Sequence, residues 1–271
     1  MTKLTLLGTG LMGGPMARNL LAKKHDLATV AETPENAVAG AGIVISMLSD
    51  GPASDAVQQA VWDSFAIGTI WVEMASIRPE EARAHAARFA GIGMGYIDAP
   101  VSGGTKGAQS ATLAIMAGGD ADTFATIQPV LSAMGRPVHV GPVGAGQLAK
   151  LANQAIVACT IGAVAEAMLL LEQGGADPAA VRDALKGGFA DSVILQQHGA
   201  RMTNRDFVPG GLTKFQIKDL DNVLSEADSL NLTLPTVSAV NDRFKHLRDA
   251  MDGGEMDHSA LYLELRARNG L

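Results

Sequence analysis

Three polar side chains stand at helical spacing in a stretch that is otherwise apolar. Lys150, Asn153 and Gln154 occupy positions i, i+3 and i+4, so on a helix they share one face. Burial readily changes the charge state of a lysine, which suits this residue to acid–base chemistry. In the alternative, Lys150 covers apolar surface with its stem and holds its amine in water. The local sequence alone favours this alternative.

A second candidate site is a glycine-rich segment, residues 98–108, with the sequence DAPVSGGTKGA. Small residues allow backbone amides to line a small anion, and Ser102 adds a hydroxyl donor. An ordinary surface turn has the same composition, and the segment by itself does not decide between the two. We expect it to be too rich in glycine to form a packed helix or strand.

The strongest signal is a short apolar run that leads into a G-x-G-x-x-G motif. The motif comprises Gly8, Thr9, Gly10, Leu11, Met12 and Gly13. A strand before it and a helix after it form the context in which such glycines bind a dinucleotide. The phosphates would lie at the helix N-terminus, which favours anions. A tight turn without a ligand is the alternative.

These candidates need a scaffold, and the apolar pattern changes halfway along the chain. Up to about residue 143, short apolar runs alternate with helical patterns, which predicts a largely parallel sheet covered on both faces. From residue 144 on, only helical patterns occur, beginning with a long apolar helix. We therefore predict two domains, an α/β dinucleotide-binding domain at 1–143 and an all-α domain for substrate and oligomerisation at 144–271.

One stretch of the first half is shorter than this scheme requires. If residues 28–32 form the second strand, almost nothing remains for the crossover to the strand at 43–48, which needs about a dozen residues. We expect a strand and a helix to be missing between Leu27 and Ala28. Glu32 has about the spacing of a ribose-binding residue, but this role cannot be transferred to it safely.

Composition limits the classes of partner. The 271 residues are 47% hydrophobic and carry a net charge of −7, which argues against nucleic acid and anionic membranes. The single cysteine, Cys159, fits a reducing compartment, and we expect a cytoplasmic protein. The apolar residues 155–171 are interrupted by Glu166 and favour a buried helix over a membrane span. The six histidines show no metal-binding spacing, and Asp257 precedes His258 and Ser259 like a helix cap.

Four blocks in order along the chain resemble the β-hydroxyacid dehydrogenase family, which includes 3-hydroxyisobutyrate dehydrogenase and tartronate semialdehyde reductase. Residues 8–20 resemble its cofactor fingerprint and 98–107 its substrate loop, D-A-P-V-S-G-G. Residues 144–154 resemble its catalytic block, G-x-G-x-x-x-K-x-x-N, and 218–220 its K-D-L element. The resemblance implies a Rossmann-type domain joined by a long helix to an all-α domain, as in 6-phosphogluconate dehydrogenase.

The resemblance also implies roles for single residues. Lys150 would be the general acid–base and Asn153 would hold the substrate, whose carboxylate would bind at Ser102, Gly103 and Gly104. The residues implied to line the cofactor, beyond the glycine motif, are Met47, Leu48, Ser76 and Lys218. The cofactor would be NAD or NADP. The residues that select between them lie, in the family, in the segment expected to be missing here.

Within the family, residues 153–154, 187–192 and 257–261 look most like tartronate semialdehyde (2-hydroxy-3-oxopropionate) reductases. The expected reaction interconverts a short semialdehyde acid and its hydroxy acid, tartronate semialdehyde and D-glycerate in the first instance. Alternatives are 3-hydroxyisobutyrate dehydrogenase or another β-hydroxyacid dehydrogenase. A non-catalytic nucleotide-binding module is the alternative of another class. We expect a homodimer or homotetramer.

Overall fold

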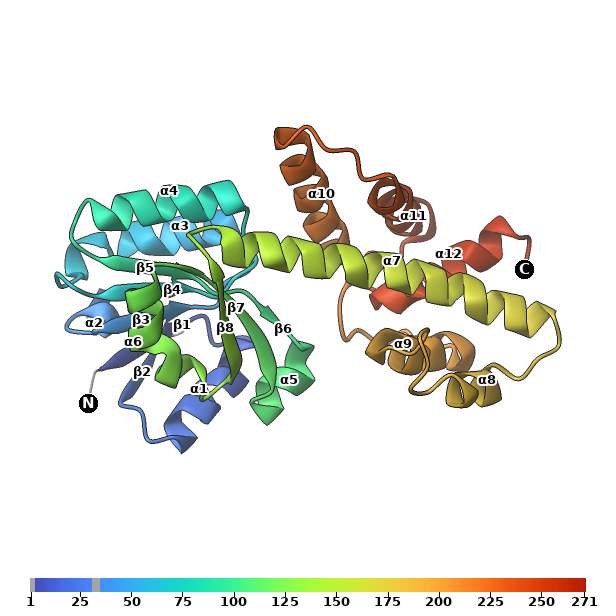
Figure 1. Ribbon diagram of the computed structural model, residues 1–271, viewed down its shortest axis with the longest axis horizontal. Helices are drawn as coiled ribbons and strands as arrows, with labels where there is room; N and C mark the ends of the chain where they lie inside the picture. Colours follow the sequence, from blue (N-terminus) through green and yellow to red (C-terminus); the bar gives the residue numbers. More distant parts are fainter. Residues whose placement is uncertain (1–2, 31–34) are drawn as a thin grey trace. The chain divides into compact units, whose positions relative to one another are not determined.

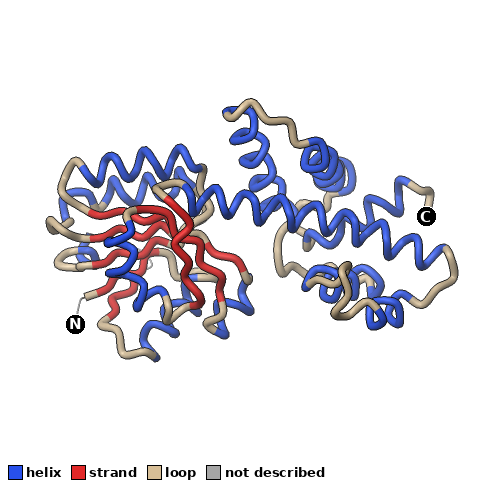
Figure 2. The backbone as a smooth tube through the Cα atoms, viewed as in Figure 1, coloured by secondary structure: helices blue, strands red, loops and turns tan. Residues whose placement is uncertain are grey.

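The computed structural model describes residues 3–30 and 35–271 of the chain. The chain divides into two compact units, which we call the N-terminal unit, Met1–Lys150, and the helical unit, Leu151–Leu271. The placement of functional domain boundaries at residues 143 and 144 stays a prediction. Figure 1 follows the order of the elements, and Figure 2 separates the strands of the first unit from the helices of the second.

The N-terminal unit is built on one sheet with the strand order β2-β1-β3-β4-β5-β7-β6, and β8 pairs with β7. Strands β1 to β5 are mutually parallel, whereas β7 runs antiparallel to β5 and β6. The strands are β1 (Leu4–Leu7), β2 (Leu27–Val30), β3 (Ile43–Ser46), β4 (Ile70–Glu73), β5 (Gly95–Asp98), β6 (Val101–Ser102), β7 (Leu113–Gly119) and β8 (Gly135–Gly141). The predicted Rossmann-type sheet is confirmed.

Alternation along the strands explains how both faces of the sheet are covered. Ile45, Val72 and Ile97 enter one core with α1 (Gly13–Ala22), α5 (Gly104–Ser110) and α6 (Ala121–Leu131). The residue before each of these in its strand points to the opposite core. These residues are Val44, Trp71 and Tyr96, and they pack there with α3 (Gly51–Ala60) and α4 (Pro79–Ala90). Successive side chains of a strand point to opposite faces, so a strand covered on both sides is apolar throughout. Figure 1 shows α3 and α4 together on their face of the sheet.

The glycine-rich segment differs from its prediction. Residues 98–108 were expected to be too rich in glycine for a packed element, yet they contain β6 and the start of α5. A Cβ on Gly107 would lie 3.2 Å from Leu113 Cδ2, so the absence of a side chain here permits close packing. Asn19 Nδ2 donates to the carbonyl of Ala108 at 2.6 Å and ties α5 to α1. The expectation was therefore wrong for this segment.

At the expected gap the structure contains a short continuous strand. Leu27 and Ala28 are adjacent in β2, which pairs in parallel with β1, and α2 (Glu35–Val38) is the one helix among the described residues of the crossover to β3. Glu32 lies outside the described residues. The loss of a longer segment at this point stays a prediction.

The helical unit consists of helices packed around one apolar core, and no strand occurs among its residues, all of which are described. Its helices are most of α7 (Ala145–Gln173), α8 (Pro178–Ala184), α9 (Val193–Asn204), α10 (Thr213–Ser229), α11 (Pro235–Met251) and α12 (Leu261–Arg268), with a 3₁₀ turn, η2 (His258–Ala260). The predicted all-α half is confirmed. Helix α7 provides Ile161, Val164 and Met168 to the core.

By length and composition α7 could cross a membrane, since its most apolar window has a mean hydropathy of 1.9. Within that window 39% is buried in the structure. Core helices of globular proteins pass the same test, so this feature is weak evidence for a membrane span. The residues that α7 contributes to the apolar core of the helical unit include Ala158, Ile161 and Met168.

Candidate active site

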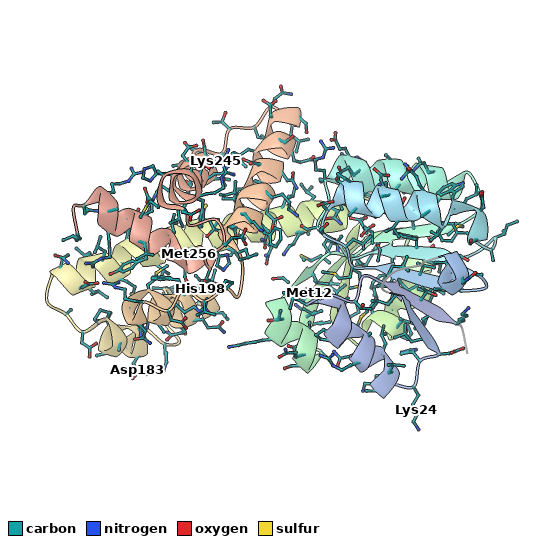
Figure 3. All side chains as sticks on the ribbon, turned by 180° about the vertical axis from the view of Figure 1, so that it is seen from behind. Met12, Lys24, Asp183, His198, Lys245 and Met256 are labelled. Atoms are coloured by element: carbon teal, nitrogen blue, oxygen red, sulfur yellow. The ribbon has the colours of Figure 1, made fainter. Side chains whose placement is uncertain are left out.

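The glycine motif forms the turn between β1 and α1. Gly8 has a φ of +89°, and a Cβ there would lie 2.4 Å from the carbonyl oxygen of Met47. A Cβ on Gly13 would overlap the carbonyl oxygen of Gly8, far inside van der Waals contact. Both glycines are therefore required by close backbone approach, as the motif predicts. Met12, labelled in Figure 3, is the residue that precedes α1.

The turn fits a dinucleotide phosphate. A Cβ on Gly10 would meet nothing within 4 Å, so the space beside the backbone is open there. Leu11 is 84% exposed, and the first turn of α1 carries no acidic side chain. Unpaired N–H groups at such a helix start favour an anion. Thr9 completes the turn, and its carbonyl lies 3.2 Å from where a Cβ of Gly14 would stand.

The other residues expected at the cofactor follow the carboxyl ends of β3 and β4. Met47 donates its N–H to the carbonyl of Leu7 at 2.9 Å, which places it and Leu48 beside the glycine turn. Ser76 lies in the segment between β4 and α4. Ligands of open α/β sheets bind at the carboxyl ends of parallel strands, and the structure brings these predicted residues to that edge.

The segment expected to bind the substrate carboxylate begins directly after β5. Ser102 ends β6, and Gly103, with a φ of +132°, precedes α5. Gly103 and Gly104 are exposed, and Ser102 is partly buried. The backbone amides of this turn are therefore accessible to a small anion. Their role in substrate binding stays a prediction.

Lys150 and Asn153 lie one turn apart on α7. Asn153 Nδ2 donates to Gln154 Oε1 at 2.8 Å, and Gln154 Nε2 donates to Asp219 Oδ2 at 2.6 Å. Lys218, the remaining predicted residue, lies on α10 of the helical unit, 3.4 Å from the Asp219 carboxylate. Asp219 of the K-D-L element thus orients the side-chain amide of Gln154 and, through it, that of Asn153. The catalytic role of Lys150 and Asn153 is untested.

Sequence reasoning missed the residues that hold the start of α7. Asp98 and Gln147 were quoted only as members of motifs, yet both are fully buried. Asp98 accepts the N–H groups of Gly144 and Gln147, each at 2.8 Å. The signal in the sequence was the carboxylate that begins the glycine-rich segment 98–108.

The structure also brings together two histidines that the sequence left scattered. His198 Nε2 lies 2.8 Å from His258 Nε2, and Asp257 lies close enough for the three to be considered as metal ligands. Asp257 is engaged, however, by Arg201 at 2.6 Å and by the N–H groups of Gly210, Gly211 and Ser259. Its bond to the Ser259 N–H is the helix cap expected from the sequence. Both oxygens of this carboxylate therefore already accept hydrogen bonds within the protein.

Two family models match the chain. Residues 24–144 match the one described as the NAD binding domain of 6-phosphogluconate dehydrogenase. Residues 144–265 match the one described as NAD-binding of NADP-dependent 3-hydroxyisobutyrate dehydrogenase. NAD or NADP is therefore the cofactor, as expected.

Full-length relatives agree with these models. The chain is 39% identical to 2-hydroxy-3-oxopropionate reductase of Escherichia coli K12, with 99% of each chain covered. It is 34% identical to a probable 3-hydroxyisobutyrate dehydrogenase of Mycobacterium tuberculosis H37Rv, again with 99% of each covered. A solved structure of 3-hydroxyisobutyrate dehydrogenase from Mycobacterium tuberculosis with L-serine has a TM-score of 0.89 at 31% identity, covering 98% of this chain and 99% of that one.

The first of these alignments bears on the short crossover. It runs over 291 positions, whereas this chain has 271 residues, so at least 20 aligned positions have no residue here. The loss of a segment near β2 itself stays a prediction.

Proposed function

Because the chain belongs to the β-hydroxyacid dehydrogenase family, we propose that it reduces tartronate semialdehyde to D-glycerate with NADH or NADPH. The observation that carries this choice is the 39% identity to 2-hydroxy-3-oxopropionate reductase over 99% of both chains. The second candidate, oxidation of 3-hydroxyisobutyrate, is supported by the fold similarity to the mycobacterial enzyme. Both substrates carry a carboxylate, and single polar contacts in the binding site decide between such similar acids.

The nicotinamide, when bound, supplies the hydride that reaches the aldehyde carbon. In our proposal Lys150 donates the proton that the aldehyde oxygen needs to become a hydroxyl group. Asn153, one turn further along α7, holds the substrate, and the amides at Ser102, Gly103 and Gly104 bind its carboxylate. Orientation and proton delivery are therefore the tasks of the protein.

The decisive assay follows absorbance at 340 nm, the nicotinamide band, at about neutral pH. NADH and NADPH are each offered with tartronate semialdehyde, methylmalonate semialdehyde and succinate semialdehyde. We expect the highest kcat/KM with tartronate semialdehyde. A preference for methylmalonate semialdehyde would favour the second candidate. No turnover with any aldehyde acid would favour a non-catalytic nucleotide-binding module.

Lys150→Ala tests the proton donor. General acid–base catalysis contributes about 10²–10⁴-fold to rate, so kcat should fall by at least about 100-fold while the Kd of the cofactor stays within about twofold. Lys186→Ala, at an exposed lysine of the helical unit paired with Asp183, is the matched control and should retain full activity. Near-normal turnover of the Lys150 variant would overturn the mechanism.

We also propose that the protein is a homodimer or homotetramer in the cytoplasm. Helix α7 presents Ile156, 66% exposed, and Leu170, 74% exposed. In a symmetric oligomer such apolar residues would be covered by the partner subunit. Light scattering at micromolar concentration should give at least twice the chain mass, and a monomer would contradict the assembly.

A further inference from the structure

The first turn of α7 is where the catalytic lysine is set in place. Gln147 lies in this turn, and Lys150 follows three residues later on the same helix. Side chains three residues apart on a helix are neighbours on its surface. Whatever fixes the backbone at Gln147 therefore also fixes where the stem of Lys150 begins.

Asp98 connects this turn to the segment that carries the predicted carboxylate site. It is the last residue of β5, four positions before Ser102, and it is 0% exposed. Its Oδ1 accepts the N–H of Gly144 and its Oδ2 the N–H of Gln147, each at 2.8 Å. The first N–H groups of a helix lack intrahelical partners, and a carboxylate there also favours the helix dipole.

Two glycines allow the backbone at the start of α7 to approach β5 and β7 closely. A Cβ on Gly146 would lie 2.4 Å from the carbonyl oxygens of both Asp98 and Met116. A Cβ on Gly118, in β7, would lie 2.6 Å from the backbone nitrogen of Gly146. Since backbone packs directly on backbone, the helix start cannot shift along the strand ends by a rearrangement of side chains.

Gln147 connects the same turn to the segment expected at the cofactor. Its side chain is fully buried. Oε1 accepts the N–H of Ile77 at 3.1 Å, and Nε2 donates to the carbonyl of Ala75 at 2.8 Å. These two residues flank Ser76, so one amide group holds the backbone on both sides of it.

We propose that Asp98 and Gln147 are positioning residues that fix Lys150 relative to the carboxylate-binding turn and to the Ser76 segment. They act through the backbone of α7. This role rests on the proposed function of Lys150. A neutral helix cap at this position would carry no charge and would avoid the cost of burying one. The positioning role accounts for the presence of a carboxylate despite that cost.

Burial raises the pKa of Asp98 to about 7, although the N–H groups of Gly144 and Gln147 act in the opposite direction. Two other titratable groups lie near Asp98: Glu73, its register partner at the end of β4, and Tyr96 in β5. Burial is the main cause that raises the pKa of each. Protonation relieves the buried charge but places a donor against helix N–H groups. The contact is therefore complete above about pH 7 and weaker below it.

The test combines Asp98→Asn and Gln147→Met with steady-state kinetics in wild-type and Lys150→Ala backgrounds. A misplacement of about 1 Å costs about 10²-fold, so each variant should lower kcat by about 10–100-fold in the wild-type background. In the Lys150→Ala background the same changes should have little further effect, because residues that act through one group are non-additive. The acid limb of kcat near pH 7 should disappear in Asp98→Asn.

Asp120→Asn is the matched control. Asp120 caps α6, which does not carry the lysine, by accepting the Thr123 N–H at 2.8 Å. This variant should keep the wild-type kcat and its acid limb. Equal losses of kcat for Asp98→Asn with and without Lys150 would overturn the proposal, as would a wild-type kcat in both Asp98→Asn and Gln147→Met.

A second measurement separates this proposal from the proposed function. If the wild-type protein reduces none of the aldehyde acids, the proposed function fails. Hydrogen exchange at the amides of residues 144–150 and the rate at which trinitrobenzenesulfonate labels Lys150 then judge the positioning contacts. Both should change in Asp98→Asn and Gln147→Met and not in Asp120→Asn. Unchanged exchange and labelling would overturn the positioning role without any assay of activity.

Discussion

Helix α7 is held by two different kinds of packing in the two units. In the N-terminal unit its first turns rest on backbone carbonyls of β5 and β7, with Gly146 at the contact and Asp98 and Gln147 as buried polar partners. In the helical unit it contributes apolar side chains such as Ile161 and Met168 to a core. An atom added between backbones forces the chain itself to move, whereas an atom added to an apolar core displaces a side chain at a cost of about 1–3 kcal/mol.

Gly146→Ala should have the largest effect on stability. The added methyl group would stand 2.4 Å from two carbonyl oxygens, so the backbone has to move. Overpacking costs about 1–3 kcal/mol, and we expect a fall of about 2–3 kcal/mol in the free energy of unfolding, since alanine's better helix propensity recovers only part. Urea unfolding followed by circular dichroism measures it.

Gly162→Ala is the matched substitution on the same helix within the helical unit. There the added methyl group would stand 2.8 Å from Cγ2 of Val240, the end of a side chain. Displacing a side chain costs less than displacing the backbone, and the gain in helix propensity of about 1 kcal/mol offsets part of it, so the change should stay within about 1 kcal/mol. Equal losses for the two glycines would contradict the contrast between backbone packing and apolar packing.

The two units should also respond in opposite directions to acid. Burial lowers the pKa of His258 to about 4, and His198 beside it also has a lowered pKa. A depressed histidine pKa means that the unfolded chain binds the proton first, so stability falls as pH drops from about 6.5 toward 4. The raised pKa of Asp98 has the opposite sign, and the stability it contributes at low pH is lost as pH rises through about 7.

Lowering the pH from 7 to 5 should therefore cost the helical unit about 2 kcal/mol through His258. Hydrogen exchange at pH 5 and 7, corrected for the intrinsic rates, should show weaker protection of α9 and α10 at pH 5. The loss should shrink in His258→Asn. Undiminished acid sensitivity in that variant would show that other groups cause it.

Sequence periodicity accounts for much of the fold. The strands β3 and β4 each begin with three apolar residues because helices cover both faces of the sheet, and such runs are recognisable in a single sequence. The glycine turn was predicted from its motif, and Gly13 meets the Gly8 carbonyl within the same strand–turn–helix unit, whereas the approach of Gly8 to Met47 after β3 became evident only in the structure. Helix α5 was missed because Gly107, a residue unfavourable inside a helix, is explained only by the approach of Leu113.

The candidate site likewise contains features that the sequence determined and contacts that only the tertiary structure revealed. The chain's own sequence determined the fold class, the family and the type of cofactor, because these depend on local patterns and on blocks preserved in order. Only the tertiary structure revealed that Asp98 bonds to Gly144, 46 positions away, that Gln147 reaches Ala75, 72 positions away, and that His198 meets His258 across 60 positions. Such contacts join residues whose spacing carries no period, so their partners follow from the packing of the strand ends and helices.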